Sequence, residues 1–279
     1  MLAALLALAA SSSWGVSSFT AGLESRRRSV WTVVAVSQLA SALSAALLLL
    51  FSRGETLTTG NVAWALIAGV CGATGLVAYY RALALGAMSV VAPIIAAQVV
   101  IPVAVGLALG ERPPVAAYAG MVLAVAGVAL VSRGGGAGVA RVPGSAILLA
   151  ILTAVLFGVM GVALDRCGSG SPLQSVFIVR LASALVILIY FFASRRRLDM
   201  GARDLPALAS VGILLTVANV LLTVAFTLGL LSIVSVLGSL SPVVIVVLAQ
   251  LFLHERLCMR QWAGVAAVFA GVLLLSLAP

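Results

Sequence analysis

The sequence has few charged residues: 8% of its 279 positions, against about a quarter in a soluble globular domain. Seven residues are acidic, and all sixteen basic residues are Arg, so Lys is absent. In contrast, 63% of the residues are hydrophobic, and apolar runs of about 20 residues, long enough to span a membrane as a helix, recur along the whole chain. This composition excludes a soluble domain and predicts a multi-pass, all-α membrane protein.

Residues that support catalysis or metal binding are scarce as well. The chain has one His, His254, and three widely separated Cys, at positions 71, 167 and 258, so we expect no metal site, no cofactor and no disulfide framework. Paired carboxylates, HExxH and a Ser/His arrangement are all missing from the apolar runs, which argues against an intramembrane enzyme. The net charge of +9 comes almost entirely from Arg in short loops, so it indicates membrane orientation rather than a nucleic-acid partner.

Gaps marked by Arg, Gly and Pro separate ten candidate membrane spans. These are Leu2–Leu23, Val30–Phe51, Asn61–Tyr80, Leu85–Leu109, Val115–Ser132, Ser145–Leu164, Pro172–Ala193, Leu205–Leu228, Leu231–Leu253 and Gln261–Leu277. The first run, MLAALLALAASSS, is similar to a signal-peptide core but lacks a basic start, so we expect it to be a span. The flexible sequence RGGGAGVARVPG after the fifth span is the natural seam of the chain.

The two sides of this seam repeat each other in order. LASAL at 39–43 returns at 181–185, 142 residues later (181 minus 39), and Trp14-Gly15 corresponds to Phe157-Gly158. The predicted domains are therefore two five-helix repeats, 1–132 and 145–279, joined by the loop 133–144. Because five crossings are odd, the second repeat enters from the other side of the membrane, so we expect two inverted repeats. Inverted repeats are typical of alternating-access transporters, whose substrate site lies at mid-membrane between them.

The distribution of Arg predicts the orientation of the chain. Twelve of the sixteen Arg fall in odd-numbered loops, three in even-numbered loops, and Arg180 lies inside a span. Since loop Arg favours the cytoplasmic side, we expect the odd-numbered loops in the cytoplasm and both termini outside. The expected location is the plasma membrane, the inner membrane of a bacterium.

Three motifs give the sequence a family resemblance. With Trp14-Gly15, with ALALGAMSVVAP leading to LGERP, and with LGLLSIVSVLGSLSPVVIVVLAQLFLHER, it resembles the drug/metabolite transporter superfamily, specifically its EamA-type ten-helix members. The resemblance covers essentially the whole chain. It implies an exporter or facilitator of small metabolites such as amino acids, working by alternating access around a central cavity, with membrane lipid and a small-molecule substrate as partners.

Other functions are compatible with the same resemblance. Relatives move amino acids, sugars, phosphorylated metabolites, nucleobases and drugs, so the alternatives are a multidrug or cation exporter and a membrane protein without transport. Small multidrug exporters, distant four-helix relatives, are expected to carry a Glu inside the first helix, where this chain has Ser11–Trp14. All seven acidic residues here lie in loops or at helix ends, so proton exchange through a buried carboxylate has no predicted carrier. Members of the family also commonly place both termini in the cytoplasm, the reverse of the Arg distribution.

Polar and aromatic residues inside the spans are the predicted lining of the substrate cavity, because polar groups in hydrocarbon must find partners. They are Trp14, Gln38, Tyr79, Gln98, Arg180, Asn219, Ser239 and Ser241. Arg180 is either a cation for a substrate carboxylate or phosphate, or a structural contact to backbone carbonyls that reaches toward the interface. Trp14 and Tyr79 have the interfacial aromatic belt as their alternative position.

Further residues predict how such a cavity would open. The fourth and ninth spans, which are equivalent in the two repeats, contain prolines that predict hinges or static kinks. These prolines are Pro93, Pro102 and Pro242. The same spans end in acid–base pairs that predict a gate or simply interface charges. These are Glu111 with Arg112 and Glu255 with Arg256.

Small-residue faces on the fifth and tenth spans, with glycines at 120, 127, 264 and 271, predict close helix packing or a homodimer.

Overall fold

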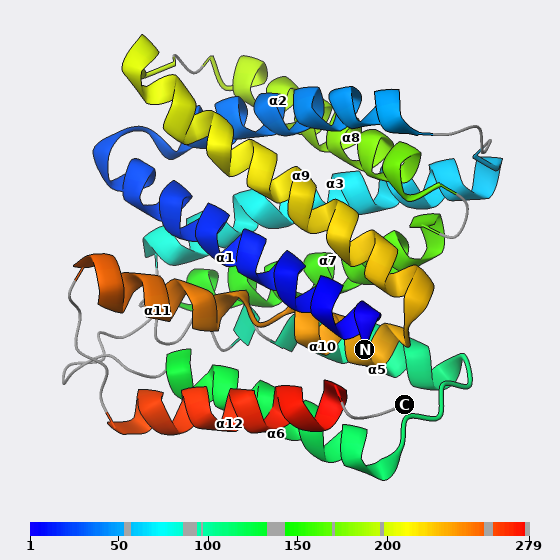
Figure 1. Cartoon of the computed structure of the whole chain (residues 1–279). Helices are drawn as coiled ribbons and strands as arrows, with labels where there is room; N and C mark the ends of the chain where they lie inside the picture. Colours follow the sequence, from blue (N-terminus) through cyan, green and yellow to red (C-terminus); the bar gives the residue numbers. More distant parts are fainter. Residues whose placement is uncertain are drawn as a thin grey trace.

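The computed structural model of the chain describes residues 1–52, 57–85, 94–95, 97–132, 143–168, 171–195, 198–253 and 259–276. Throughout these residues the ordered elements are helices, and there are no strands among them (Figure 1). The first repeat contains α1 (Leu2–Arg27), α2 (Val30–Leu48), η1 (Leu49–Phe51), α3 (Thr59–Leu85), η2 (Ala97–Val99), α5 (Val100–Ala108) and α6 (Val115–Ser132). The second contains α7 (Gly144–Gly168), α8 (Pro172–Ala193), η3 (Ala202–Asp204), α9 (Leu205–Leu228), α10 (Leu231–Gly238), α11 (Ser241–Leu253) and α12 (Met259–Ser276).

These helices account for the ten predicted spans in order. Six are long and apolar enough to cross a membrane, namely Leu2–Ser25, Val30–Phe51, Thr59–Tyr79, Gly144–Gly168, Pro172–Ala193 and Ala202–Leu228. Four shorter apolar helices fill the remaining places, namely Ala97–Ala108, Val115–Gly127, Leu231–Ile245 and Trp262–Gly271. Large apolar side chains such as Leu43, Ile189 and Phe192 are exposed on the outside, as lipid contact requires. The predicted fold class, a multi-pass all-α membrane protein, is confirmed.

The ninth span is broken rather than continuous. The sequence predicts one helix over Leu231–Leu253, but α10 ends at Gly238 and α11 begins at Ser241. Pro242 thereby falls in the first turn of α11, where a missing backbone N–H leaves no helical bond unmade. Pro102 likewise lies in the first turn of α5, directly after η2. Pro93 lies outside the described residues, and the use of these prolines as hinges stays a prediction.

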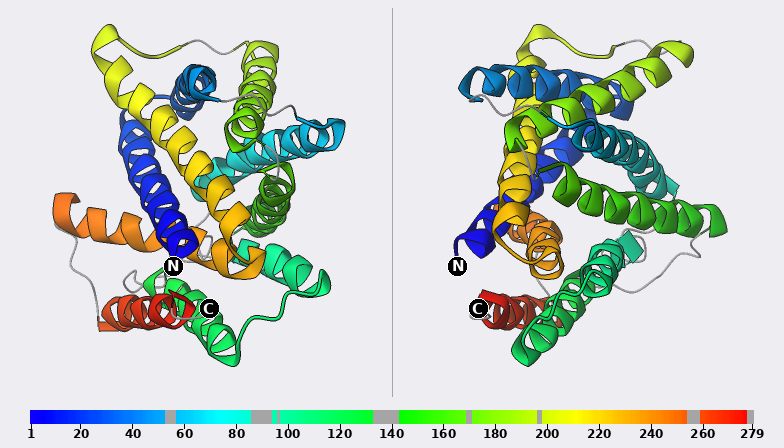
Figure 2. Two further views of the ribbon diagram at one scale, coloured as in Figure 1. Left: turned by 45° about the vertical axis from the view of Figure 1, so that its right-hand side comes forward. Right: turned by 90° about the vertical axis from the view of Figure 1, so that its right-hand side faces the viewer.

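Each repeat packs chiefly against the other repeat. α3 lies along α7 and α1 lies along α9, while α2 contacts both α8 and α9, and α3 contacts α8 (Figures 1 and 2). α6 pairs with α12 at one edge of the bundle. Exchanging the two repeats converts this set of contacts into itself, because α1, α2, α3 and α6 are equivalent to α7, α8, α9 and α12. The bundle is therefore organised around a pseudo-two-fold axis.

The pairing of α6 with α12 shows the direction of the copies. A Cβ on Gly127 would lie 2.7 Å from the carbonyl oxygen of Gly264, and a Cβ on Gly271 would lie 2.7 Å from that of Gly120. From Gly120 to Gly127 along α6, the contacting glycine of α12 changes from Gly271 back to Gly264, so the two helices are antiparallel. Since they are equivalent helices, the axis is perpendicular to them and the repeats are inverted, as predicted. The small-residue faces are used within one chain, and a homodimer stays a prediction.

The repeated LASAL sequence makes the same close helix crossing in both copies. In α8, the Cβ of Ala182 and the carbonyl oxygen of Val179 each lie 2.6 Å from where Gly69 of α3 would place a Cβ. Ser183 Oγ donates a hydrogen bond of 2.9 Å to the carbonyl oxygen of the same glycine. The equivalent crossing of α2 with Gly212 of α9 uses Ser37, Ala40 and Ser41. Small residues permit backbone contact between helices, so the motif is repeated because this contact is repeated.

Candidate functional site

The aromatic–glycine pairs of the two repeats lie where α1 and α7 cross the fourth and ninth spans. A Cβ on Gly158 of α7 would lie 2.8 Å from the carbonyl oxygen of Gln98. That carbonyl has no N–H four residues ahead, because the residue there is Pro102. Gly15 of α1 makes the equivalent approach to α11, with the Ser241 carbonyl oxygen 3.1 Å from its would-be Cβ. The glycines allow these close crossings, and the aromatic residue before each glycine faces a pocket between the repeats.

This pocket, here called the central pocket, is small. Its volume is about 50 Å³, room for one or two water molecules. It is lined by Trp14, Gln98, Val99, Pro102, Phe157, Met160, Gly161, Leu222, Phe226, Ser235, Gly238 and Ser239. The lining comes from both repeats and includes both aromatic residues of the aromatic–glycine pairs.

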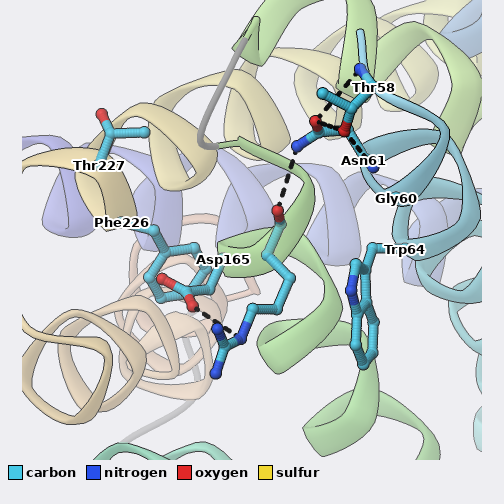
Figure 3. Close-up of a pocket in the computed structure, with 8 residues that line it drawn as sticks. Thr58, Gly60, Asn61, Trp64, Asp165, Phe226 and Thr227 are labelled. Carbon is cyan, nitrogen blue, oxygen red and sulfur yellow. Dashed lines mark hydrogen bonds and ion pairs between the residues drawn. The ribbon is translucent and has the colours of Figure 1, made fainter.

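A larger pocket, here called the mouth pocket, lies toward the face of the even-numbered loops, and Figure 3 shows the residues that line it. Its volume is about 530 Å³, within the usual range for small-molecule sites. It is lined by Thr58, Gly60, Asn61, Trp64, Asp165, Arg166, Phe226 and Thr227. These residues lie at the start of α3 and at the ends of α7 and α9. Phe226, only 5% exposed, lines both pockets and so lies between them.

Hydrogen bonds fix the rim of the mouth pocket. Asn61 Nδ2 donates to the carbonyl oxygen of Arg166 at 3.3 Å (Figure 3). It also donates to the carbonyl oxygen of Cys167 at 3.2 Å, so two carbonyls at the end of α7 are satisfied. Asp165 Oδ2 lies 3.9 Å from Arg166 Nε in an ion pair. The rim thus combines an acid, a base, an amide and the indole of Trp64, groups suited to polar organic molecules.

At the opposite face, formed by the odd-numbered loops, charged and aromatic contacts join described helices of the two repeats. Arg28 Nε pairs with Glu24 at 2.9 Å, and the same guanidinium pairs with Asp204 at the start of α9. The hydrogen bond to Asp204, together with the two nearby carboxylates, raises the pKa of Arg28 above its ordinary value. Arg81 Nη2 donates to Tyr190 Oη at 2.6 Å.

The contacts of Tyr190 in α8 with Trp31 and Arg81 also join the two repeats. Its ring stacks on Trp31 with a centroid distance of 4.8 Å, and the Arg81 guanidinium lies 5.8 Å from each ring centre. These contacts connect α2, α3 and α8 at the face of the odd-numbered loops.

The predicted cavity residues separate into three groups. Trp14, Gln98 and Ser239 line the central pocket. Tyr79 lies beside it, with its ring centroid 6.4 Å from that of Phe157, and Ser241 supplies the carbonyl facing Gly15. The remaining three are buried in the bundle and line neither pocket; they are Gln38, Arg180 and Asn219.

These three buried residues have polar atoms without partners. Gln38 and Arg180 are 4% and 5% exposed, and Asn219 is fully buried. Within the part of the chain that the structure describes, Gln38 Oε1, Arg180 Nε and both amide atoms of Asn219 make no hydrogen bond. Arg180 therefore does not reach toward the interface or turn to lipid. Such atoms call for water or a ligand, because an unsatisfied polar group inside a membrane is costly.

Glu111, one of the four predicted gate residues, accepts hydrogen bonds from the other repeat. Its carboxylate accepts the backbone N–H groups of Leu231 at 2.5 Å and Ser232 at 3.0 Å, the first two residues of α10. Arg112 is exposed beside it, and the partner pair Glu255 and Arg256 lies outside the described residues. A gating function for these residues stays a prediction.

Sequence reasoning missed the mouth pocket and Phe226. The repeat could have indicated Phe157, the counterpart of Trp14, as a lining residue. Nothing in the pattern separates Phe226 from the other apolar residues of its span, because its position depends on how α9 packs against α7 and α10.

Comparison with known proteins places the chain in context. Residues 1–133 and 144–277 each match the EamA-like transporter family. An uncharacterized protein of Methanocaldococcus jannaschii is 29% identical over 133 residues, which make up 48% of this chain and 97% of the relative. That relative is thus about half as long as this chain. A solved crystal structure has the same fold, with a TM-score of 0.81 over 99% of this chain and 98% of the other, at 19% identity.

Proposed function

Because this chain belongs to the EamA-like transporter family, and so is a multi-pass membrane transporter, we propose that it moves small metabolites such as amino acids by alternating access. It acts as an exporter or facilitator in the plasma membrane, with the central pocket on the substrate path. The mouth pocket is the approach from the side of the even-numbered loops, which the Arg distribution places outside.

The observation that carries this proposal is the difference between the two faces. A pocket of about 530 Å³ opens toward the even-numbered loops, where hydrogen bonds of Asn61 and Glu111 join the repeats around it. At the odd-numbered loops, an ion pair and stacked rings join the helices. Two inverted copies allow a second arrangement, in which the copies exchange conformations and the faces exchange states. Phe226 lies between the mouth pocket and the central pocket, where a movement of α9 would join them.

Reconstituted transport tests the proposal. Purified protein in liposomes loaded with a pooled metabolite mixture, amino acids included, should release one or a few compounds with saturable kinetics, measured by mass spectrometry. Release should be insensitive to a proton gradient, because every acidic residue of the chain lies in a loop or at a helix end. Liposomes without protein give the background, and failure to release any compound above it would contradict metabolite transport.

A matched pair of variants tests the path. Ser239→Trp fills the central pocket and should reduce release to background, whereas Ile189→Trp adds the same ring to an exposed, lipid-facing position and should leave release unchanged. Equal release by the two variants would exclude the central pocket as the route.

A further inference from the structure

We infer that the transported substrate carries a single anionic group of the carboxylate type, and that Arg180 binds this group in the middle of the bundle. The inference rests on the proposed transport function and names its substrate class. Its basis is a buried cation for which the described part of the protein provides no counter-ion.

Arg180 is the ninth residue of α8 and is 5% exposed. Its Nε has no hydrogen-bond partner, and none of the ion pairs among the described residues includes it. A buried charge without a partner is strongly unfavourable, so a folded chain that retains one requires a compensating group. In a transporter, the substrate is such a group.

The acidic residues that the structure describes are engaged elsewhere or lie near the membrane faces. Glu24 and Asp204 pair with Arg28, Asp165 pairs with Arg166, and the carboxylate of Glu111 accepts two N–H groups of α10. Asp199 lies in the loop after α8, where its backbone N–H donates to Thr32 Oγ1. A carboxylate that reaches Arg180 must therefore come from outside this part of the chain.

Neighbouring helices carry further buried polar groups without partners. α8 runs antiparallel to α2, as the stacking of Trp31 on Tyr190 and the 3.5 Å contact of Ser52 Oγ with Ser171 Oγ show. Gln38, the repeat counterpart of Arg180, is therefore also near the middle of its helix. α9 packs against both α2 and α8 and carries Asn219, whose amide has no partner.

These groups fit a carboxylate. The guanidinium is a planar fork of N–H donors that matches the two oxygens of a carboxylate, and an Asn amide adds another donor. Because the pseudo-two-fold mate of Arg180 is the uncharged Gln38, the site has one positive charge rather than two. One charge favours a monoanionic group over a doubly charged phosphate and opposes a cationic drug.

Three variants test the inference by release from liposomes. For each compound that wild-type protein releases, Arg180→Gln should slow the release of carboxylates by about 10- to 150-fold, the effect of losing a hydrogen bond to a charged group. Arg180→Lys should retain part of the rate, because it keeps the charge without the fork. Arg260→Gln removes the same charge at the exposed start of α12 and should behave as wild type.

Thermal unfolding in detergent distinguishes binding from a structural contact. Without ligand, Arg180→Gln should raise the midpoint by a few degrees, because an uncompensated buried charge is removed. Acetate should stabilise the wild type but not this variant, and acetamide, its neutral isostere, should stabilise neither. A lower midpoint for Arg180→Gln would instead assign Arg180 to helix packing and overturn the inference.

The remaining outcomes separate the two proposals. Unchanged carboxylate release by Arg180→Gln, or faster release of cations, would overturn the inference while leaving transport established. A stronger response to inorganic phosphate than to acetate would overturn the carboxylate class. If the wild type releases nothing, the proposed function fails, and the acetate measurement still decides whether Arg180 binds an anion.

Discussion

At the scale of single residues, glycine and small side chains determine how closely the helices cross. Gly69 and Gly212 occupy equivalent positions on α3 and α9, and each meets the LASAL sequence of the other repeat. The contact brings backbone against backbone, so a methyl group has no space. Such contacts replace the large apolar side chains of a soluble core, since lipid offers no hydrophobic force to hold helices together.

Gly69→Ala should lower the free energy of unfolding by about 1–3 kcal/mol, because the new Cβ would lie 2.6 Å from the Val179 carbonyl oxygen. The measurement is the midpoint of thermal unfolding in detergent. The control is Gly22→Ala, where a Cβ meets nothing within 4 Å and the gain in helix propensity is about 0.5–1 kcal/mol. If both variants shifted the midpoint of unfolding in the same direction, the crossing at Gly69 would not be closely packed.

At the scale of elements, α10 depends on a contact from the other repeat. It has eight residues, Leu231–Gly238, too few to form a stable helix alone. Its first two N–H groups are bound by Glu111, which precedes α6. A carboxylate at this position satisfies unpaired donors and interacts favourably with the positive end of the helix. The broken ninth span is thus tied to the first repeat at its start.

Glu111→Ala should destabilise the start of α10 by about 0.5–2 kcal/mol, the usual effect of losing an N-terminal cap. Hydrogen–deuterium exchange of a peptide covering residues 231–238 should become faster. In Glu111→Gln, which keeps one acceptor oxygen, the exchange rate should lie between those of the wild type and Glu111→Ala. Arg112→Ala, at the exposed neighbouring residue, should leave this exchange rate unchanged. If Arg112→Ala increased the exchange rate as much as Glu111→Ala, the cause would be loosening of the whole loop and not loss of the cap.

At the scale of the whole molecule, the two repeats are related in sequence but differ in how each face is closed. Arg28 joins the end of α1 to the start of α9 at one face, and the corresponding sequence of the second repeat, Gly170-Ser171, has no charged side chain. The mouth pocket lies at that second face. Among the described residues, the ion pair that joins the two repeats, Arg28 with Asp204, lies at the odd-numbered-loop face, whereas hydrogen bonds of Asn61 and Glu111 join the repeats at the other face.

Arg28→Gln should weaken the closure of the odd-numbered-loop face and populate a form that is wider there. Spin labels on cysteines introduced at Gly22 and Arg203, in a background without native Cys, would report a longer distance component in lipid nanodiscs. Arg195→Gln, which removes an exposed charge at the same face, is the control. A distance distribution identical to that of the starting protein would show that Arg28 does not hold this face closed.

The sequence alone determined the ten spans, the repeat and its inversion, because hydrophobic length and an odd number of crossings are local, countable properties. It also indicated Trp14, Gln98 and Ser239, whose polar or aromatic character is conspicuous among apolar residues. Only the tertiary structure decided that the ninth span is broken, that Glu111 caps α10, and that Phe226 lies between two pockets. These features depend on which helices of the opposite repeat come into contact, and no periodicity within one helix encodes that choice.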